Sequence, residues 1–263
     1  MVKFTVITCT FNAETELPAT LHSILEQRYR HVEHLIIDGV SHDRTVDIAA
    51  DYKKRSAEAQ TGHTIRILSE ADKGLYDAMN KGMRLATGDY LVYLNAGDSF
   101  PEPDTLAHIS RSVKDAEKLP GVLYGDTNIV DCKGRFLRHR RLAPRQGLNW
   151  RSFKAGMSVC HQAFYARTDL ARCHPYRLCY RYSADVDWCI NVMKEAERRG
   201  LELRNVHAVI ANFQDGGMTT KNHRASLKER FVIMKNHYGW ASTIGLHLWF
   251  VLRRFLKQTI AVE

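Results

Sequence analysis

Residues 90–98 are Tyr-Leu-Val-Tyr-Leu-Asn-Ala-Gly-Asp, an apolar run that ends in a polar tip. The five leading residues suit a buried strand. Ligands of open α/β sheets bind just beyond the carboxyl ends of strands, so Asp98 is the first candidate for a divalent-metal or phosphate-linked site. Gly97 would let the backbone approach a ligand closely or take a positive φ. The alternative is a plain strand-to-loop turn, because Asn, Gly and Asp all favour turns.

Three earlier stretches end in the same way. The β-branched run 4–10 ends at Thr10, residues 35–37 lead into Asp38, and residues 64–68 end near Asp72. Apolar residues at helical spacing lie between these stretches, so the expected order is βαβαβαβα. This order predicts an α/β fold with a mostly parallel sheet and helices on both faces. Short right-handed crossovers would then bring all the strand ends to one edge of the sheet.

The pattern changes after Pro120. Strands are expected at 122–126, 157–166 and 203–213, a hairpin turn at 131–134, and helices that begin near Ser183 and Asn222. A basic run extends from Arg135 to Lys154. The sequence predicts two halves of one domain, 1–120 and 121–239, followed by an amphipathic tail at 240–263. That tail has the composition of an interfacial membrane helix, although a helix packed on the core or on a second subunit would look similar.

The composition is that of a folded protein with an anionic partner. The 263 residues are 44% hydrophobic and 25% charged, and the net charge of +9 suggests nucleic acid, a phosphorylated substrate or an anionic membrane surface. The six cysteines form no Cys-x-x-Cys pair and no zinc spacing, so free thiols in a reducing compartment are expected. We expect no signal peptide and no membrane-spanning segment.

Several nucleotide and hydrolase signatures are absent, including Gly-x-Gly-x-x-Gly, the phosphate loop, Gly-x-Ser-x-Gly and His-Glu-x-x-His. A nucleotide site would therefore depend on carboxylates and a metal. Mg²⁺ or Mn²⁺ held by one or two carboxylates can bridge a diphosphate and stabilise it as it departs. Asp98 fits that metal site, and Asp38 and Asp72 could accept hydrogen bonds from a base or ribose. Any one of the three alone is more typical of a turn or a helix cap.

Several stretches together resemble the inverting family 2 glycosyltransferases of the GT-A fold. The resemblance is close over about the first hundred residues and loose beyond, and the Asn-x-Gly-Asp tip is similar to members of the colanic-acid and exopolysaccharide type. The stretches that carry it are 4–12 (Phe-Thr-Val-Ile-Thr-Cys-Thr-Phe-Asn), 36–45 (Ile-Ile-Asp-Gly-Val-Ser-His-Asp-Arg-Thr), 72–82 (Asp-Lys-Gly-Leu-Tyr-Asp-Ala-Met-Asn-Lys-Gly), 86–90 (Ala-Thr-Gly-Asp-Tyr) and 95–98 (Asn-Ala-Gly-Asp).

The resemblance implies a role for each matching position. Asp98 would bind Mn²⁺ or Mg²⁺. This chain departs from the family, which usually has an Asp-x-Asp at the tip, so one carboxylate offers the metal fewer ligands than usual. The residues that would line the nucleotide-sugar pocket are Thr10, Asn12, Asp38, Ser41, Asp72, Gly74, Asn80, Asn95 and Gly97.

Inverting transfer also needs a general base that takes the proton of the acceptor hydroxyl. The family places it at a helix start in the second half, which here implies Asp185, with Asp187 as the alternative. Without the resemblance, each would be an ordinary helix N-terminal carboxylate. His161 and Gln162 would lie near the acceptor. Gly216, Gly217, Thr219, Lys221, His223 and Arg224 are similar to a mobile lid, or form a plain solvated loop.

The predicted function is a metal-dependent inverting glycosyltransferase that moves a sugar from a nucleotide-sugar, for which we expect a UDP-sugar, to a saccharide or lipid-linked saccharide in polysaccharide biosynthesis. We expect it in the cytoplasm, with contact to the inner face of the membrane, and we expect no nucleic-acid partner. The alternatives are a degenerate nucleotide-binding module and a sugar nucleotidyltransferase. Assays of pyrophosphate release and of salt-sensitive oligonucleotide binding would separate these classes.

Overall fold

A computed structural model gives the fold, and it describes residues 1–143, 147–216 and 222–249. One eight-stranded sheet has the order β3-β2-β1-β4-β7-β5-β6, with β8 paired to β5. Its strands are β1 (Phe4–Thr10), β2 (Val32–Asp38), β3 (Thr64–Ser69), β4 (Tyr90–Tyr93), β5 (Val122–Val130), β6 (Phe136–His139), β7 (Phe164–Arg167) and β8 (Leu203–Gln214). Strands β1 to β4 pair in parallel, as β5 and β8 do, whereas β6 and β7 run antiparallel to their neighbours. The predicted mostly parallel sheet is confirmed.

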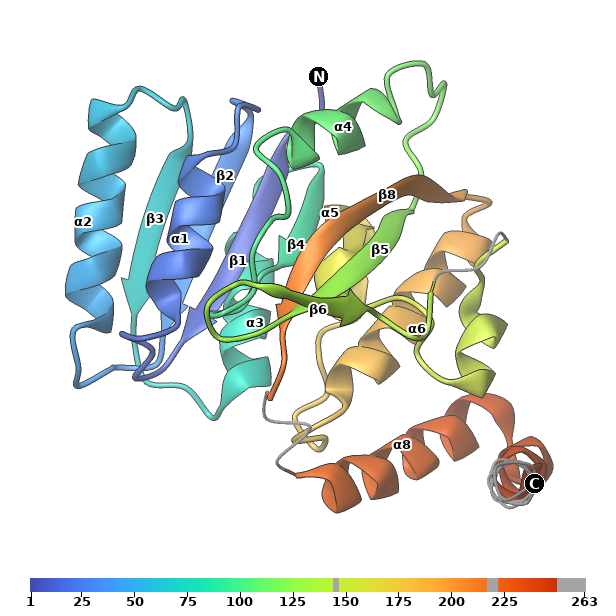
Figure 1. Cartoon of the computed structure of the whole chain (residues 1–263). Coiled ribbons are helices and arrows are strands. Elements are labelled where there is room, and N and C mark those ends of the chain that lie inside the picture. Colours follow the sequence, from blue (N-terminus) through green and yellow to red (C-terminus); the bar gives the residue numbers. More distant parts are fainter. Residues whose placement is uncertain (144–146, 217–221, 250–263) are drawn as a thin grey trace, which may run out of the picture.

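Helices cover both faces of this sheet (Figure 1). Helices α1 and α2 pack together beside β1 to β3, and α3, α5 and α6 form the layer on the opposite face. The helices are α1 (Leu17–Leu25), α2 (Thr45–Glu58), α3 (Leu75–Leu85), α4 (Thr105–Arg111), α5 (Thr168–Cys173), α6 (Ala184–Arg198) and α8 (His223–Tyr238), with 3-10 turns η1 (Trp150–Ala155) and η2 (His161–Ala163). Residues 240–249 are also helical.

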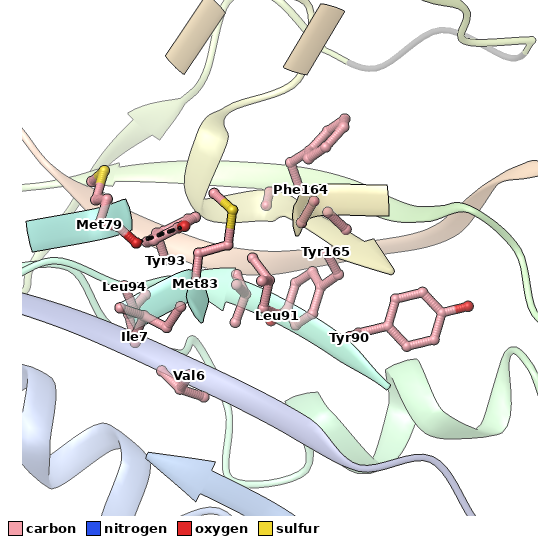
Figure 2. Close-up of a cluster of buried hydrophobic side chains, with 14 of the residues drawn as sticks. Val6, Ile7, Met79, Met83, Tyr90, Leu91, Tyr93, Leu94, Phe164 and Tyr165 are labelled. Atoms are coloured by element: carbon pink, nitrogen blue, oxygen red, sulfur yellow. Dashed lines mark hydrogen bonds between the residues drawn. The ribbon is translucent and has the colours of Figure 1, made fainter. Parts of the chain in front are cut away.

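Strand β4 lies at the centre of the core. All four of its residues are fully buried, between β1 on one side and β7 on the other (Figure 2). The Tyr93 hydroxyl donates to the carbonyl of Met79 on α3 at 3.2 Å, so the polar end of this buried ring is satisfied. Strand pairing ends at Tyr93, although the Leu94 amide still bonds to the carbonyl of Ile7. The apolar half of residues 90–98 thus fixes the place of the polar half.

One expectation for the second half needs correction. The strand expected at 157–166 begins only at Phe164, because residues 161–163 form the 3-10 turn η2, and β7, which pairs with β4 and β5, starts after it. The hairpin turn at 131–134 is confirmed, since it joins the antiparallel pair β5 and β6.

None of the helices in the described part of the chain is both long enough and apolar enough to cross a bilayer.

Candidate functional site

A pocket of about 770 Å³ opens at the carboxyl ends of the central strands. It lies between the end of β1, the loop after β4 and the end of β8. Eight of the residues predicted from sequence line it: Thr10, Asn12, Asp72, Gly74, Asn95, Asp98, Gln162 and Gly216. A second hollow of about 680 Å³, between α4 and the start of β8, contains none of the predicted residues. The expected gathering of strand ends therefore produces a real cavity.

Asp98 forms part of the floor of this pocket and is almost completely buried. Its Oδ2 accepts a hydrogen bond from Gln162 Nε2 at 2.8 Å, and its Oδ1 accepts one from the backbone amide of Gln214 at 3.1 Å. Burial raises the pKa of Asp98 to about 7, and the hydrogen bonds from Gln162 and Gln214 only partly offset that rise. The carboxyl group is thus held in place by two elements distant in sequence.

The loop that carries Asp98 is anchored by hydrogen bonds to Thr20 on α1. The Thr20 hydroxyl donates to the carbonyl of Asp98 at 2.7 Å and accepts from the amide of Gly97 at 2.9 Å. Gly97 has a φ of +97°, and a Cβ there would lie 2.2 Å from Gln214 Oε1. The positive φ therefore favours a glycine at position 97, and a side chain there would also displace the end of the Gln214 side chain. Thr20 was missed from sequence, although a polar residue among Leu17, Leu21 and Ile24 was a usable signal.

The donor set suits a hard divalent cation. Asn95 Oδ1 is buried in the same loop as Asp98 and has no hydrogen-bond partner among the residues described. An amide oxygen and a carboxylate are the ligands that Mg²⁺ and Mn²⁺ accept, and Mg²⁺ typically completes its shell with substrate phosphates and water. In the described ranges no group of three His, Cys, Asp or Glu side chains could hold a metal by itself. The residues thus fit a metal bound jointly with a ligand.

Asp38 does not line the pocket but stabilises, through hydrogen bonds, the segments around it. It is buried, and its oxygens accept hydrogen bonds from Thr10 Oγ1, Ser69 Oγ and both the amide and hydroxyl of Ser41. Burial would raise the pKa of Asp38, but these bonds outweigh it and hold the pKa low. Ser41 in turn accepts from the amide of Asn12 at 2.9 Å, which secures the loop after β1.

Asp72 and Gly74 form the opposite lip, at the start of α3. Asp72 Oδ1 accepts from the Gly74 amide at 2.7 Å, and Gly74 has a φ of +109°, which a residue with a Cβ rarely adopts. Asn80 lies further along α3 and outside the pocket, where its amide bonds both the N–H and the C=O of Tyr176. Asn80 therefore joins α3 to the 174–183 segment and reaches no donor site.

Asp185 lies in the first turn of α6, outside the pocket but next to its wall. The hydroxyl of Tyr76 donates to Asp185 Oδ1 at 3.3 Å, and Tyr76 is on α3, whose first residue, Leu75, lines the pocket. Burial raises the pKa of the Cys160 thiol, and the charges of Asp98 and Asp185 both add to that rise. Both carboxylates therefore lie close enough to the Cys160 thiol to affect it.

His161 stacks on Tyr93 and contacts Tyr176 through Nε2 at 3.1 Å. Burial lowers the pKa of His161, and Asp185 opposes that effect. The imidazole is therefore neutral near pH 7. His161 lies in the same 3-10 turn as Gln162, but of the two only Gln162 lines the pocket.

Asp187, the alternative base, is turned away from the pocket. It is buried and bonded to Arg177, to His237 Nε2 at 2.8 Å and to Asn191. Burial would raise the pKa of Asp187, but the hydrogen bonds from His237 and Arg177 outweigh it and hold the pKa low. This cluster ties α6 to α8 and to the preceding loop, which is a structural role.

Other pocket residues had weak signals in the sequence. Gln214, whose amide holds Asp98, ends β8, so the rule that strand ends carry ligand groups could have found it. Tyr76 lies in a stretch that resembles the family, but nothing in that stretch indicates its contact with Asp185. Of the predicted lid, Gly216 lines the pocket and His223 and Arg224 begin α8, whereas Gly217, Thr219 and Lys221 lie outside the described residues, as does the tail from 250 onwards.

Comparisons with solved structures support the fold. The structure of S. aureus TarS 1-349 in complex with UDP-GlcNAc superposes with a TM-score of 0.64 at 15% identity, covering 96% of this chain and 72% of that chain. Mannosyltransferase PcManGT from Pyrobaculum calidifontis, in complex with GDP-Man and Mn²⁺, gives a TM-score of 0.59 at 17% identity over 99% of this chain and 80% of that one. The GT-A fold expected from sequence is confirmed.

Sequence comparisons show the family. A "PGL/p-HBAD biosynthesis glycosyltransferase" of Mycobacterium tuberculosis (strain ATCC 25177 / H37Ra) is 34% identical over 219 residues, which cover 81% of this chain and 77% of that protein. The family model described as "Glycosyl transferase family 2" matches residues 5–173, which include the whole sheet edge from Thr10 to Asp98 and the turn with Gln162. The chain is a glycosyltransferase and belongs to glycosyl transferase family 2.

Proposed function

We propose that this glycosyltransferase binds a UDP-sugar and a divalent metal in the pocket at the strand ends and transfers the sugar with inversion. The observation that carries the proposal is that one loop brings to the pocket both the buried Asp98 carboxylate and Asn95, whose Oδ1 has no hydrogen-bond partner among the described residues. The UDP-GlcNAc of the TarS structure and the Mn²⁺ of PcManGT support this choice of ligands.

The metal would be held by Asp98 and Asn95, and when bound it supplies positive charge to the departing diphosphate. The protein's own residues would enclose the donor and orient the Asp98 carboxylate. The loop after β1, with Thr10 and Asn12, and the lip formed by Asp72 and Gly74 enclose the nucleoside side of the pocket. Gln162 keeps the Asp98 carboxylate aimed into it.

Asp185 is the proposed general base. As the acceptor oxygen forms its bond to the anomeric carbon, the bond from that carbon to the diphosphate breaks and the acceptor proton passes to an Asp185 oxygen. Asp185 is partly exposed, and among the described residues its side chain accepts one hydrogen bond, from Tyr76 to Oδ1, so we propose that the other oxygen takes that proton. Asp187 is fully engaged by Arg177 and His237 and is not available for it.

Thermal unfolding in the presence of UDP, GDP or dTDP, each with and without Mn²⁺, tests the donor site. Wild-type protein should gain roughly 2.7 kcal/mol with a nucleotide at about a hundred times its Kd. That gain should need Mn²⁺ and should vanish in Asp98→Ala. Asp185→Asn should keep the gain and lose sugar transfer. A protein that no nucleotide stabilises would instead be a degenerate module, and transfer that survives in Asp185→Asn would remove this residue as the base.

The acceptor is proposed to be a saccharide or a lipid-linked saccharide, met at an anionic membrane surface. Apolar side chains at 240, 244 and 248 repeat every four residues on one face of the last described helix, and Trp240, Ile244 and Leu248 are all exposed. The exposed cations Arg224 and Lys228 lie on α8, which precedes that helix. A second copy docked here would bring like charges together, so an anionic lipid surface is the better partner. All six cysteines are free, as in a reducing compartment.

A further inference from the structure

The start of α6, which carries Asp185, is held from outside the helix. Ser183 occupies the N-cap position but makes no side-chain capping bond to α6. Its hydroxyl instead contacts Ser226 Oγ at 2.9 Å and donates to the Ser226 carbonyl at 3.3 Å, and both serines are buried. Ser226 lies in the first turn of α8. The hydroxyl of an N-cap serine usually accepts a hydrogen bond from a backbone amide in the first turn of its own helix. The Ser183 hydroxyl instead bonds to α8, so α8 holds the start of α6.

Glu229, one turn further along α8, completes this arrangement. Its Oε1 accepts the backbone amide of Arg181 at 2.8 Å, and its Oε2 accepts those of Tyr182 and Ser183 at 2.8 and 2.9 Å. Three consecutive amides that converge on one anion form a strong, directional anchor, and the negative charge also suits the N-terminus of α6. The backbone just before Asp185 is thereby fixed to α8.

The side chain of Asp185 is held by Tyr76. Its hydroxyl lies 3.3 Å from Asp185 Oδ1, and burial raises the pKa of Tyr76, with further rises from the charges of Asp185 and Glu229. Both carboxylates are thus close to the same ring. Tyr76 reaches Asp185 from α3, beside the pocket, and Glu229 fixes its backbone from α8.

We propose that Glu229 is a positioning residue that sets the place of Asp185 by anchoring residues 181–183 to α8. The inference rests on the proposed function of Asp185 and goes beyond it, because it makes α8 part of the frame of the reaction site. Glu229 touches neither the pocket nor the reacting atoms. Its loss should let the first turn of α6 shift, and a displacement of about 1 Å in a reacting group can lower the rate about 100-fold.

The test compares Glu229→Ala, Glu229→Gln and the control Glu195→Ala. Glu195 also accepts several hydrogen bonds, from Arg198 and Arg199, but lies at the far end of α6. The glutamine can keep its oxygen toward Tyr182 and Ser183 and loses only the bond from Arg181. The first readout is amide hydrogen exchange of residues 181–187. The second is kcat and KM for UDP release from UDP-glucose, UDP-galactose and UDP-GlcNAc, with water as the acceptor.

Glu229→Ala should speed exchange in 181–187 at least tenfold and lower kcat about 10- to 100-fold, with the donor KM within twofold of wild type. Glu229→Gln should fall between, and Glu195→Ala should match wild type in both readouts even if it unfolds at a lower temperature. Wild-type exchange in Glu229→Ala, or an equal loss of kcat in Glu195→Ala, overturns the proposal. If the wild type releases no UDP, the proposed function fails, and the exchange data alone still decide whether Glu229 anchors this segment.

Discussion

The side-chain amide of Gln162 donates a hydrogen bond of 2.8 Å to the buried carboxyl group of Asp98. The two residues are 64 positions apart in the sequence and both lie within the family match, and the turn η2 brings them together beside the end of β8. Gln162 also accepts from the Cys160 thiol at 2.9 Å, so its amide orientation is fixed by that neighbour. A carboxyl group held so firmly in a buried place has consequences for stability, for metal binding and for the loop around it.

Asp98→Asn should stabilise the protein, and more so at high pH. The pKa of Asp98 is raised from 3.8 to about 7 by burial, so the folded state keeps its proton while the unfolded state loses it between those values. Stability from this group therefore falls as pH rises from about 4 to about 7 and stays lower above. The asparagine removes that loss, up to about 4 kcal/mol. Urea unfolding at pH 5 and pH 8 measures it, with the surface variant Asp104→Asn as control. A gain that is the same at both pH values would contradict the raised pKa.

Metal-assisted nucleotide binding should strengthen as pH rises. A divalent cation needs the charged carboxylate, and Asp98 gains that charge only as pH passes about 7. The extra thermal stabilisation by UDP with Mn²⁺ over UDP alone should thus be small at pH 6 and large at pH 8. Asn95→Ala should weaken the Mn²⁺ effect, since it removes the buried Oδ1 that has no protein partner in the described part of the chain. If Asn95→Ala binds Mn²⁺ and UDP as wild type does, Asn95 is not a ligand.

Asp187→Ala should destabilise the protein strongly, whereas Asp185→Asn should not. Asp187 is buried and accepts hydrogen bonds from His237 and from the exposed Arg177, and removal of the carboxylate leaves the buried His237 Nε2 without its acceptor, which typically costs about 1–3 kcal/mol. Asp185 is partly exposed, and within the part of the chain that the structure describes its side chain accepts one hydrogen bond, from Tyr76. Urea titrations of the two variants at pH 7 decide the matter. Equal stabilities would mean that Asp187 is not the structural carboxylate of the pair.

The sheet, and the position of the pocket at the carboxyl ends of its strands, could be predicted because both depend on local sequence patterns. Buried runs such as residues 4–10 and 90–94, each followed by a polar tip, predict parallel strands whose ends meet, and the pocket is found there. The different roles of the individual acidic residues could not be predicted. Asp38 and Asp98 both follow strands, yet Asp38 is saturated by hydroxyl and amide donors from three separate stretches, and only the folded chain shows which neighbours each carboxylate meets.

The same limit explains the second half. Asp185 and Asp187 are two residues apart on one helix, and their roles differ because one faces Tyr76 and the other faces Arg177 and His237. The 3-10 turn that carries Gln162 precedes a strand of only four residues. The number of β-branched and aromatic residues in such a stretch does not show where the turn ends and the strand begins. Glu229 gave no signal at all, since its partners are backbone amides, which every sequence has.

Gly97→Ala should disturb the Asp98 loop more than a glycine substitution elsewhere. At position 97 the new Cβ meets both a positive φ of 97° and the Gln214 side chain at 2.2 Å. Gly134 also has a positive φ, of 75°, but has open space around it, so Gly134→Ala carries the backbone cost alone. Each should lose about 1–3 kcal/mol from backbone strain, with the larger loss at 97. Only Gly97→Ala should also weaken UDP binding with Mn²⁺. Equal effects on binding would show that the contact with Gln214 is unimportant.

The helix at 240–249 should bind anionic vesicles through its apolar face. Trp240 and Leu248 are 58% and 65% exposed, and burial of each in a lipid interface contributes roughly 1.5–3 kcal/mol. The double variant Trp240→Ala, Leu248→Ala should therefore lower the affinity for phosphatidylglycerol vesicles at least tenfold in co-sedimentation. Phe136→Ala is the matched control, because Phe136 is 55% exposed but lies on β6. Binding should also weaken with added salt, since the cations of α8 contribute to it. Unchanged binding in the double variant, or wild-type protein that ignores the vesicles and is dimeric in solution, would reassign this face to a second copy of the chain.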